Sequence, residues 1–226
     1  GEASTFVTHI EFVNDGIVCG GGGIIKVFDI HKGAVQRFLP TKEREFSDLS
    51  LSKKHVNLVC TASATRGFIH IYDLRQQKHH ELVGQLSLPE KQSIFSVAMD
   101  DNIIAGSGKQ QVYLWDKRKV TQSTAPSHTL QWYHNEDVTK ARFHPFDDSV
   151  DTHLFSVSED GLINEYNLAN IQTPSNDDEA DQVLINTYSC NKELWNVGFF
   201  RDEQSKQQFV YALSNDDSLF VHRTGA

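Results

Sequence analysis

The sequence has few residues of the kinds that would place it outside the cell or across a membrane. Only three of its 226 residues are cysteines, Cys19, Cys60 and Cys190, and they lie far apart with no Cys-x-x-Cys pair. Such a set is typical of reduced thiols, so we expect a cytoplasmic or nuclear location, or both. The first residues lack the basic and apolar regions of a signal peptide, and no stretch approaches the roughly 18 apolar residues of a membrane span. We therefore expect no membrane association.

Basic residues are also scarce relative to acidic ones. The chain has 21 Lys and Arg residues against 30 Asp and Glu residues, a formal net charge of −9 with histidine neutral. Surfaces that bind nucleic acid usually carry a clustered excess of Lys and Arg, so no nucleic-acid partner is expected. The five prolines, 38% hydrophobic residues and 10% aromatic residues are typical of a folded domain and argue against global disorder.

Helical periodicity is absent, and short apolar segments separated by Gly, Asp, Asn and Ser turns take its place. This pattern predicts many short antiparallel strands. One sequence motif occurs five times: a turn, alternating apolar residues, then an aromatic residue followed by an acid or an amide. In the last copy His and Arg take the last two places. The copies are Gly23–Asp29, Gly67–Asp73, Gln111–Asp116, Gly161–Asn167 and Asp217–Arg223. The aromatic residues of the first four copies are 44, 43 and 51 residues apart, a period that indicates β-propeller blades.

We therefore predict an all-β fold, a single β-propeller domain over residues 1–226 with five recognisable blades from about residue 6 to the end. The blades are expected at approximately 5–39, 46–88, 94–133, 138–188 and 194–226. Four strands are predicted in each of the first four blades, and three in the fifth. The fourth spacing, 56 residues from Tyr166 to His222, is lengthened by an acidic insertion at 173–182. That insertion is either a tolerated loop extension or a docking segment for a basic partner.

The fourth copy of the repeat is the most complete. It runs His134-Asn135-Glu136-Asp137-Val138, then Ala141-Arg142-Phe143-His144-Pro145, then Ser156-Val157-Ser158-Glu159-Asp160-Gly161 through Tyr166-Asn167. This pattern resembles the WD-repeat family across the whole chain, and the motifs between Ile94 and Asp217 resemble one branch of that family most. Members usually have about seven blades, so the resemblance implies that these five belong to a seven-bladed ring in a longer chain.

The resemblance also implies a polar network in the fourth blade. Family members place a His before the first strand, a Ser in the second, an Asp in the turn and a Trp at the end of the third. By position these are His134, Ser156 and Asp160, with Tyr166 in place of the Trp. The repeat spacing favours this structural network over a catalytic role for the same His, Ser and Asp. The other repeats depart from the pattern and are expected to rely on packing; the departures are Gly22, Ala62 with Arg66, Ala105 with Lys109, and Ala212.

No motif predicts catalysis, a cofactor or a metal. The segment Ala105–Gln110 lacks the glycine, the hydroxyl and the following helix of a phosphate-binding loop. The four glycines at 20–23 suit a tight turn between strands. The eleven histidines have no partner carboxylate or cysteine at ligand spacing, and there is no Gly-x-Ser-x-Gly elbow. We therefore expect a protein that is not an enzyme.

Two consecutive repeats carry an arginine two residues after the terminal aspartate. These pairs are Asp73 with Arg75 and Asp116 with Arg118. They resemble the Asp-x-Arg boxes of substrate receptors for cullin-type ubiquitin ligases, in which the arginines meet the adaptor protein. Arginine suits such an interface because its planar fork binds carboxylates and carbonyls through two parallel bonds.

The loops at the opposite end of the blades offer a second candidate surface. Propeller loops form rigid scaffolds for protein and peptide recognition, in which a few aromatic or Arg anchors supply most of the binding energy. The primary interpretation is a non-catalytic scaffold that binds partner proteins or peptides through these loops; the alternative is a ligase substrate receptor. The candidate partner-binding residues of the loops are Arg44, Lys91, Trp132, Tyr133 and Lys192.

Overall fold

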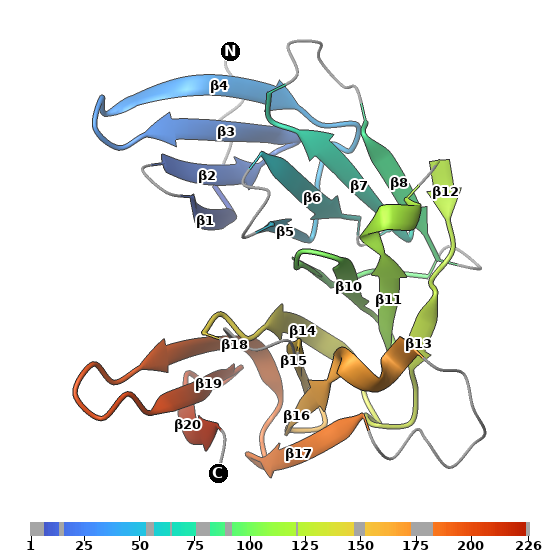
Figure 1. Cartoon of the computed structure of the whole chain (residues 1–226), viewed down its shortest axis with the longest axis vertical. Helices are drawn as coiled ribbons and strands as arrows, with labels where there is room; N and C mark the ends of the chain where they lie inside the picture. The colour runs from blue at the N-terminus through green and yellow to red at the C-terminus, as the bar shows by residue number, and fades with distance from the viewer. Residues whose placement is uncertain are drawn as a thin grey trace. The chain divides into compact units, whose positions relative to one another are not determined.

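The computed structural model describes residues 7–13, 16–52, 57–63, 65–75, 82–88, 92–120, 122–146, 152–172 and 183–224. These residues form five β-sheets, one for each predicted blade, and the predicted all-β propeller fold is confirmed (Figure 1). The chain divides into two compact units. The first comprises the described residues up to Gly106 together with Leu114–Ser127, and the second comprises Ser107–Tyr113 with those from His128 onward.

The first unit contains the first two sheets. The first sheet has the order β1-β2-β3-β4, with strands β1 (His9–Val13), β2 (Gly16–Gly21), β3 (Ile24–Asp29) and β4 (Ala34–Pro40). The second has the order β12-β8-β7-β6-β5, with β5 (Asp48–Leu51), β6 (Leu58–Ala62), β7 (Phe68–Asp73), β8 (Gly84–Ser87) and β12 (Gln122–Thr124). Neighbouring strands are antiparallel, except that β12 runs parallel to β8.

The third sheet contains residues of both units. Its order is β13-β11-β10-β9, with β9 (Ser96–Met99), β10 (Ile103–Ser107), β11 (Val112–Asp116) and β13 (His128–Leu130). A short 3-10 helix, η2 (Lys117–Lys119), follows β11 and precedes β12. The sequence does not predict β12, because three polar residues carry no alternating pattern.

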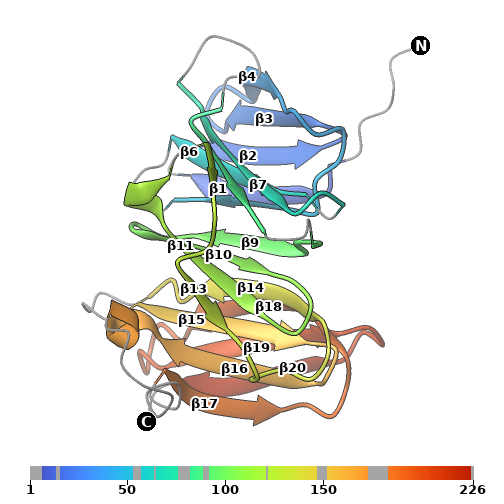
Figure 2. The same cartoon turned by 90° about the vertical axis from the view of Figure 1, so that its right-hand side faces the viewer.

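The second unit contains the last two sheets. The fourth has the order β14-β15-β16-β17, with β14 (Val138–Phe143), β15 (His153–Ser158), β16 (Leu162–Asn167) and β17 (Leu184–Ser189). A 3-10 helix, η3 (Leu168–Gln172), follows β16. The fifth has three strands, as expected: β18 (Leu194–Arg201), β19 (Gln208–Ser214) and β20 (Leu219–Thr224). Figure 2 shows the strands of these two sheets from the side. The predicted acidic insertion at 173–182 lies outside the described residues.

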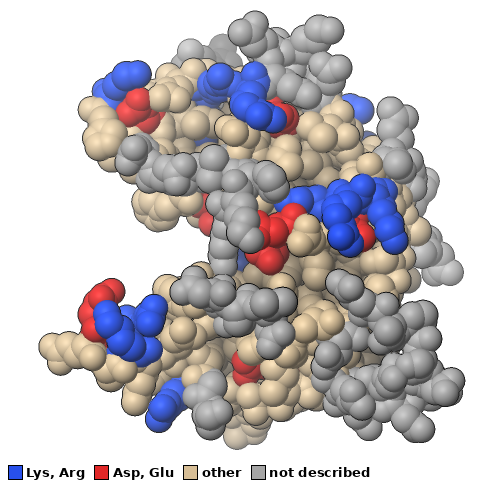
Figure 3. Space-filling model, in the orientation of Figure 1, with Lys and Arg blue, Asp and Glu red and all other residues tan. Residues whose placement is uncertain are grey.

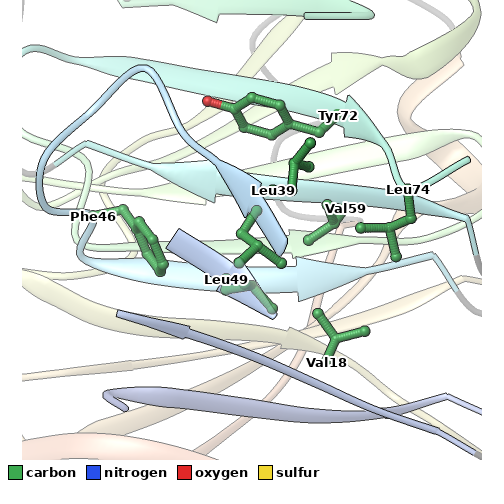
Figure 4. Close-up of a cluster of buried hydrophobic side chains, with 8 residues drawn as sticks. Val18, Leu39, Phe46, Leu49, Val59, Tyr72 and Leu74 are labelled. Atoms are coloured by element: carbon green, nitrogen blue, oxygen red, sulfur yellow. The ribbon is translucent and has the colours of Figure 1, made fainter. Parts of the chain in front are cut away.

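The hydrophobic core lies between the sheets of each unit. In the first unit, side chains from strands β2 to β7 come together in one cluster (Figure 4), made of Val18, Ile25, Leu39, Phe46, Leu49, Val59, Tyr72 and Leu74. In the second unit the corresponding cluster is Phe155, Val157, Ile163, Cys190, Leu194, Val197, Val210 and Ala212. Each large side chain buried in this way contributes about 1.5–3 kcal/mol to folding. The packing therefore fixes the ends of the strands, where the candidate functional residues lie.

Candidate functional site

The four residues of the implied network form one continuous chain of hydrogen bonds in the fourth blade. His134 Nδ1 lies 3.0 Å from Asp160 Oδ2, and His134 Nε2 lies 2.7 Å from the Ser156 hydroxyl. The Ser156 oxygen is in turn 3.2 Å from the hydroxyl of Tyr166, so tyrosine supplies the link that the family gives to tryptophan. His134, Ser156 and Tyr166 are buried, and the Asp160 side chain is 8% exposed.

Hydrogen bonding and burial determine which groups of this network are protonated. An ionised carboxylate only accepts hydrogen bonds, so Nδ1 of His134 is protonated and donates its hydrogen bond to Asp160. Burial alone would raise the pKa of Asp160, but hydrogen bonds from His134 and from the backbone N–H groups of Asn135 and Leu162 lower that pKa overall. Burial raises the pKa of Tyr166, so its hydroxyl stays protonated. The network therefore joins a loop, a turn and two strands.

A fifth member of the network, Asn164, is not predicted from the sequence. Its amide nitrogen lies 3.2 Å from His134 Nε2 and donates to the backbone oxygen of Tyr133 at 2.8 Å, while its amide oxygen accepts from the Thr187 hydroxyl. An Asn in a strand ordinarily indicates a solvent-facing position, yet this one is buried. The available signal is its position opposite Ser156 in the strand register. Asn164 thereby fixes the loop that contains Trp132.

Trp132 and Tyr133 are adjacent in the sequence but have opposite environments. Trp132 is 92% exposed and has a positive φ of 70°. Tyr133 is half-buried, and its ring packs edge-on against that of Tyr166 with 5.5 Å between centroids. A bulky residue in the left-handed region is strained, and such strain persists only where the surroundings impose it. The network around His134 and Asn164 supplies that constraint and holds Trp132 out into solvent.

Replacing Trp132 with glycine is therefore expected to stabilise the protein. Glycine adopts positive φ without steric cost, and the tryptophan ring loses little packing because it is exposed. We expect the free energy of unfolding to rise by about 1 kcal/mol, measured by urea denaturation. Trp132→Ala keeps a Cβ at the same φ and is the control, with no comparable gain. A loss of stability in Trp132→Gly would show that the indole packs against the protein.

The other candidate partner-binding residues of the loops that the structure describes are not part of the hydrogen-bond network. Lys192 Nζ contacts the carboxylate of Asp216 and the hydroxyl of Ser218. Arg44 is exposed in the loop that precedes β5. Its backbone lies against Gly23: a Cβ added to Gly23 would be 3.0 Å from the carbonyl oxygen of Arg44. Lys91 lies outside the described residues. Of these candidates, the structure joins Tyr133 to the network and leaves Trp132 and Arg44 exposed.

The register corrects one position in the second blade. In the fourth blade Ser156 pairs with Asn164, two residues before the aromatic end of the strand. In the second blade the residue paired in the same way is Thr61, opposite His70. The hydroxyl position is therefore held by Thr61 and not by Ala62, because the paired positions are nine residues apart in the second blade and eight in the fourth.

The expectation that the second blade relies on packing alone is accordingly wrong. The Tyr72 hydroxyl accepts the backbone N–H of Lys42 at 3.0 Å and is also hydrogen-bonded to Thr61. Glu43, in the loop before β5, pairs with Arg66 in the turn between β6 and β7 at 3.7 Å. A loop-to-turn pair is thus kept, but the acidic residue lies in the loop and the basic residue in the turn, the reverse of the order of His134 and Asp160.

The two Asp-x-Arg pairs have the same local geometry. Arg75 donates to Asp73 through its backbone N–H, Nε and Nη2, and Arg118 does the same to Asp116. These hydrogen bonds lower the pKa of both aspartates. The arginine side chains are 67% and 68% exposed. Figure 3 shows Lys and Arg side chains gathered over the turn between β11 and β12, which contains Lys117, Arg118 and Lys119.

A second buried polar cluster surrounds Glu165 in the fourth blade. Its carboxylate accepts from Asn186 at 2.9 Å and from the Tyr188 hydroxyl at 3.2 Å, and lies 3.4 Å from His153 Nδ1. Burial opposes ionisation, but the hydrogen bonds from His153 and Asn186 lower the pKa of Glu165 overall. Burial and the charge of Glu165 raise the pKa of Tyr188 to about 12. No sequence pattern predicts this cluster, because its members are separated along the chain.

The cluster predicts a dependence of stability on pH. The folded state holds the pKa of Glu165 below its ordinary value of 4.5, so the unfolded state binds more protons as the pH falls through that value. The stabilisation is present above this value and is lost as the pH falls through the lower folded-state pKa. Glu165→Gln is expected to reduce the slope of stability against pH, measured by urea unfolding between about pH 3 and 6. Glu203→Gln, on an exposed turn, is the control; equal slopes in both variants would contradict the assignment.

Among the described residues, no group of His, Cys, Asp or Glu side chains is arranged to hold a metal ion. Nor does this part of the chain contain a helix with the length and apolar character needed to cross a bilayer. What the site offers is an exposed aromatic side chain on a loop held by hydrogen bonds from Asn164 and to Asp160. Such an arrangement can bind a partner.

Fold, repeat and network together define a WD-repeat β-propeller, and the chain belongs to that family. It is similar to WD repeat-containing protein 89 homolog of Dictyostelium discoideum, with 26% identity over 223 residues, covering 97% of this chain and 55% of that protein. This is the branch that the motifs between Ile94 and Asp217 resemble. The chain is also similar to WD repeat-containing protein GTS1 of Arabidopsis thaliana, with 32% identity over 179 residues, covering 78% of this chain and 40% of the relative.

The structural comparison agrees on the fold. A chain in a structure titled "Crystal Structure of Mitotic Checkpoint Complex" superposes with a TM-score of 0.70 at 19% identity, covering 98% of this chain and 63% of the other. No protein-family profile matches the sequence. The chain thus spans about half the length of the curated relatives it matches.

Proposed function

We propose that the chain is a non-catalytic scaffold that binds partner proteins or peptides through its propeller loops. The observation that carries the proposal is Trp132, a tryptophan 92% exposed at positive φ on a loop fixed by buried hydrogen bonds. Tryptophan is enriched among the residues that dominate binding energy, and a rigid anchor loses little entropy when it binds. Membership of the WD-repeat family is consistent with an interaction scaffold.

The test is recovery of partners on immobilised protein. Wild-type chain and Trp132→Ala are incubated with the same cell extract, and bound proteins are quantified by mass spectrometry. We expect the variant to lose at least about tenfold in recovery of its specific partners, since an anchor tryptophan contributes 2 kcal/mol or more. Leu219→Ala, an exposed apolar residue on β20, is the control for general loss of apolar surface. Equal recovery by wild type and Trp132→Ala would contradict the proposal.

A second candidate function is that of a substrate receptor for a cullin-type ubiquitin ligase. The favouring observation is the shared geometry of the two Asp-x-Arg pairs, which hold both arginines in the same exposed conformation. An arginine already oriented by its aspartate loses less freedom on binding. Pull-down with the cullin adaptor, comparing wild type with Arg75→Ala/Arg118→Ala, tests it. Equal recovery of the adaptor by both proteins would exclude this function.

We also propose a reducing compartment, the cytoplasm or nucleus. Cys19, Cys60 and Cys190 form no disulfide with one another, and all three are buried. Burial raises the pKa of Cys190 to about 11, which suppresses the reactive thiolate. Cell fractionation would test this location; recovery of the protein mainly in a secreted fraction would contradict it.

A further inference from the structure

The loops around Trp132 form a connected surface in the second unit. Four backbone hydrogen bonds join successive segments: Val138 N to Gly108 O at 3.1 Å, Glu159 N to Asp137 O at 3.1 Å, Cys190 N to Gly161 O at 2.8 Å and Asn215 N to Glu193 O at 3.2 Å. A Cβ on Gly161 would lie 3.0 Å from backbone atoms of Lys192, and its φ is +80°, so the segments are closely packed as well. We name residues 108–111, 131–137, 159–161, 190–193 and 215–218 the acidic loop surface.

The charge of this surface is strongly negative. Besides Asp160 of the buried network, its segments contain six acidic residues, Glu136, Asp137, Glu159, Glu193, Asp216 and Asp217, against two lysines, Lys109 and Lys192. One lysine, Lys192, is already paired with Asp216. The carboxylates are close enough to affect one another: burial and the charges of Asp137, Glu193 and Glu136 all raise the pKa of Glu159.

The exposed indole lies on the same loop as two of these acids. Trp132 precedes Glu136 and Asp137 by four and five residues, and the intervening Asn135 is fixed by Asp160 and by the side chain of Gln110. A tryptophan face attracts ammonium and guanidinium groups, and it does so more strongly where nearby carboxylates also draw them in. An apolar or acidic partner would gain nothing from these charges, and nucleic acid would be repelled.

We propose that the acidic loop surface binds a Lys- or Arg-rich segment of a partner protein, with one cationic side chain over the ring of Trp132 and others facing the carboxylates of Glu136, Asp137, Glu159 and Glu193. The inference rests on the proposed scaffold function and specifies the chemistry of its partner. Association is faster and more sensitive to salt than for a neutral contact, because complementary charges steer the encounter.

The test is fluorescence anisotropy with two fluorescein-labelled peptides of equal length, one with arginines spaced by glycine and serine, the other with glutamate at each arginine position. We expect binding of the basic peptide only, weakened as salt is raised from about 0.05 to 0.3 M. Trp132→Ala is expected to weaken it about fivefold or more. Glu136→Gln/Glu159→Gln should weaken it and reduce the salt dependence.

Glu203→Gln is the matched control, since Glu203 is 90% exposed on the β18–β19 turn, away from the acidic loop surface in sequence. It should leave the affinity unchanged. Equal effects of all charge variants would show non-specific attraction and overturn the inference, as would equal binding of the acidic peptide. If the extract experiment finds partners that depend on Trp132 while the basic peptide does not bind, the scaffold function stands and the basic partner is wrong.

Discussion

Replacing Asp160 with alanine is expected to lower the free energy of unfolding by about 3 kcal/mol. The substitution leaves the Nδ1–H group of buried His134 without its acceptor, at a site where the imidazole side chain is 1% exposed. It also removes the acceptor of the backbone N–H groups of Asn135 and Leu162. An unsatisfied donor in such a place costs more than the hydrogen bond itself contributes, because water does not replace the partner.

The fifth blade provides the matched control for Asp160. Asp216 holds the same turn position and accepts from Ser214 and Lys192, but its side chain is 55% exposed. Water can replace its partners, so Asp216→Ala is expected to have a much smaller effect. Urea denaturation of both variants, followed by tryptophan fluorescence, makes the comparison. Equal losses in the two variants would mean that the buried network contributes no more than an exposed turn.

Replacing Phe155 with alanine is expected to cost about 4 kcal/mol. Phe155 is fully buried in the core of the second unit. Its ring packs against those of Phe199 and His144, with centroids 5.1 and 5.8 Å apart. The substitution loses this apolar contact and leaves a cavity, because the strands of two blades on either side cannot collapse into the space.

Phe12→Ala is the control for loss of a phenyl ring as such. Phe12 is 75% exposed on β1, so we expect its removal to change stability by less than about 0.5 kcal/mol. Thermal unfolding of both variants measures the difference. A Phe155→Ala protein as stable as Phe12→Ala would show that the packing between the fourth and fifth blades is looser than these ring contacts indicate.

The fold was predictable because the repeated motif combines alternating apolar residues with an end that recurs at a regular spacing. Each copy of the motif contains the third strand of a sheet or most of it, as Gly161–Asn167 contains β16. The parallel strand β12 was not predictable, since its polar residues are held by contacts with a distant strand of another blade. Tertiary context overrides local pattern at such places.

Only those residues of the candidate site that recur at fixed positions in the repeat could be predicted from the sequence. The positions of His134, Ser156 and Asp160 follow from the repeat, and the structure brings them together. The role of Asn164 does not, because a strand position becomes buried only when a neighbouring loop covers it. The positive φ of Trp132 depends in the same way on the buried residues that follow it. The Glu43–Arg66 ion pair could not be predicted either, because it forms only when the loop before β5 packs against the turn between β6 and β7.

Site-specific photo-cross-linking tests most directly whether this scaffold meets its partners through the acidic loop surface. A photoreactive phenylalanine analogue is placed at position 132 in one protein and at position 203 in another. Both positions are exposed and both lie in the second unit. We expect the partner proteins recovered from cell extract to cross-link at position 132 and not at position 203. Cross-links confined to position 203, or none at position 132 while the partners remain bound, would contradict it.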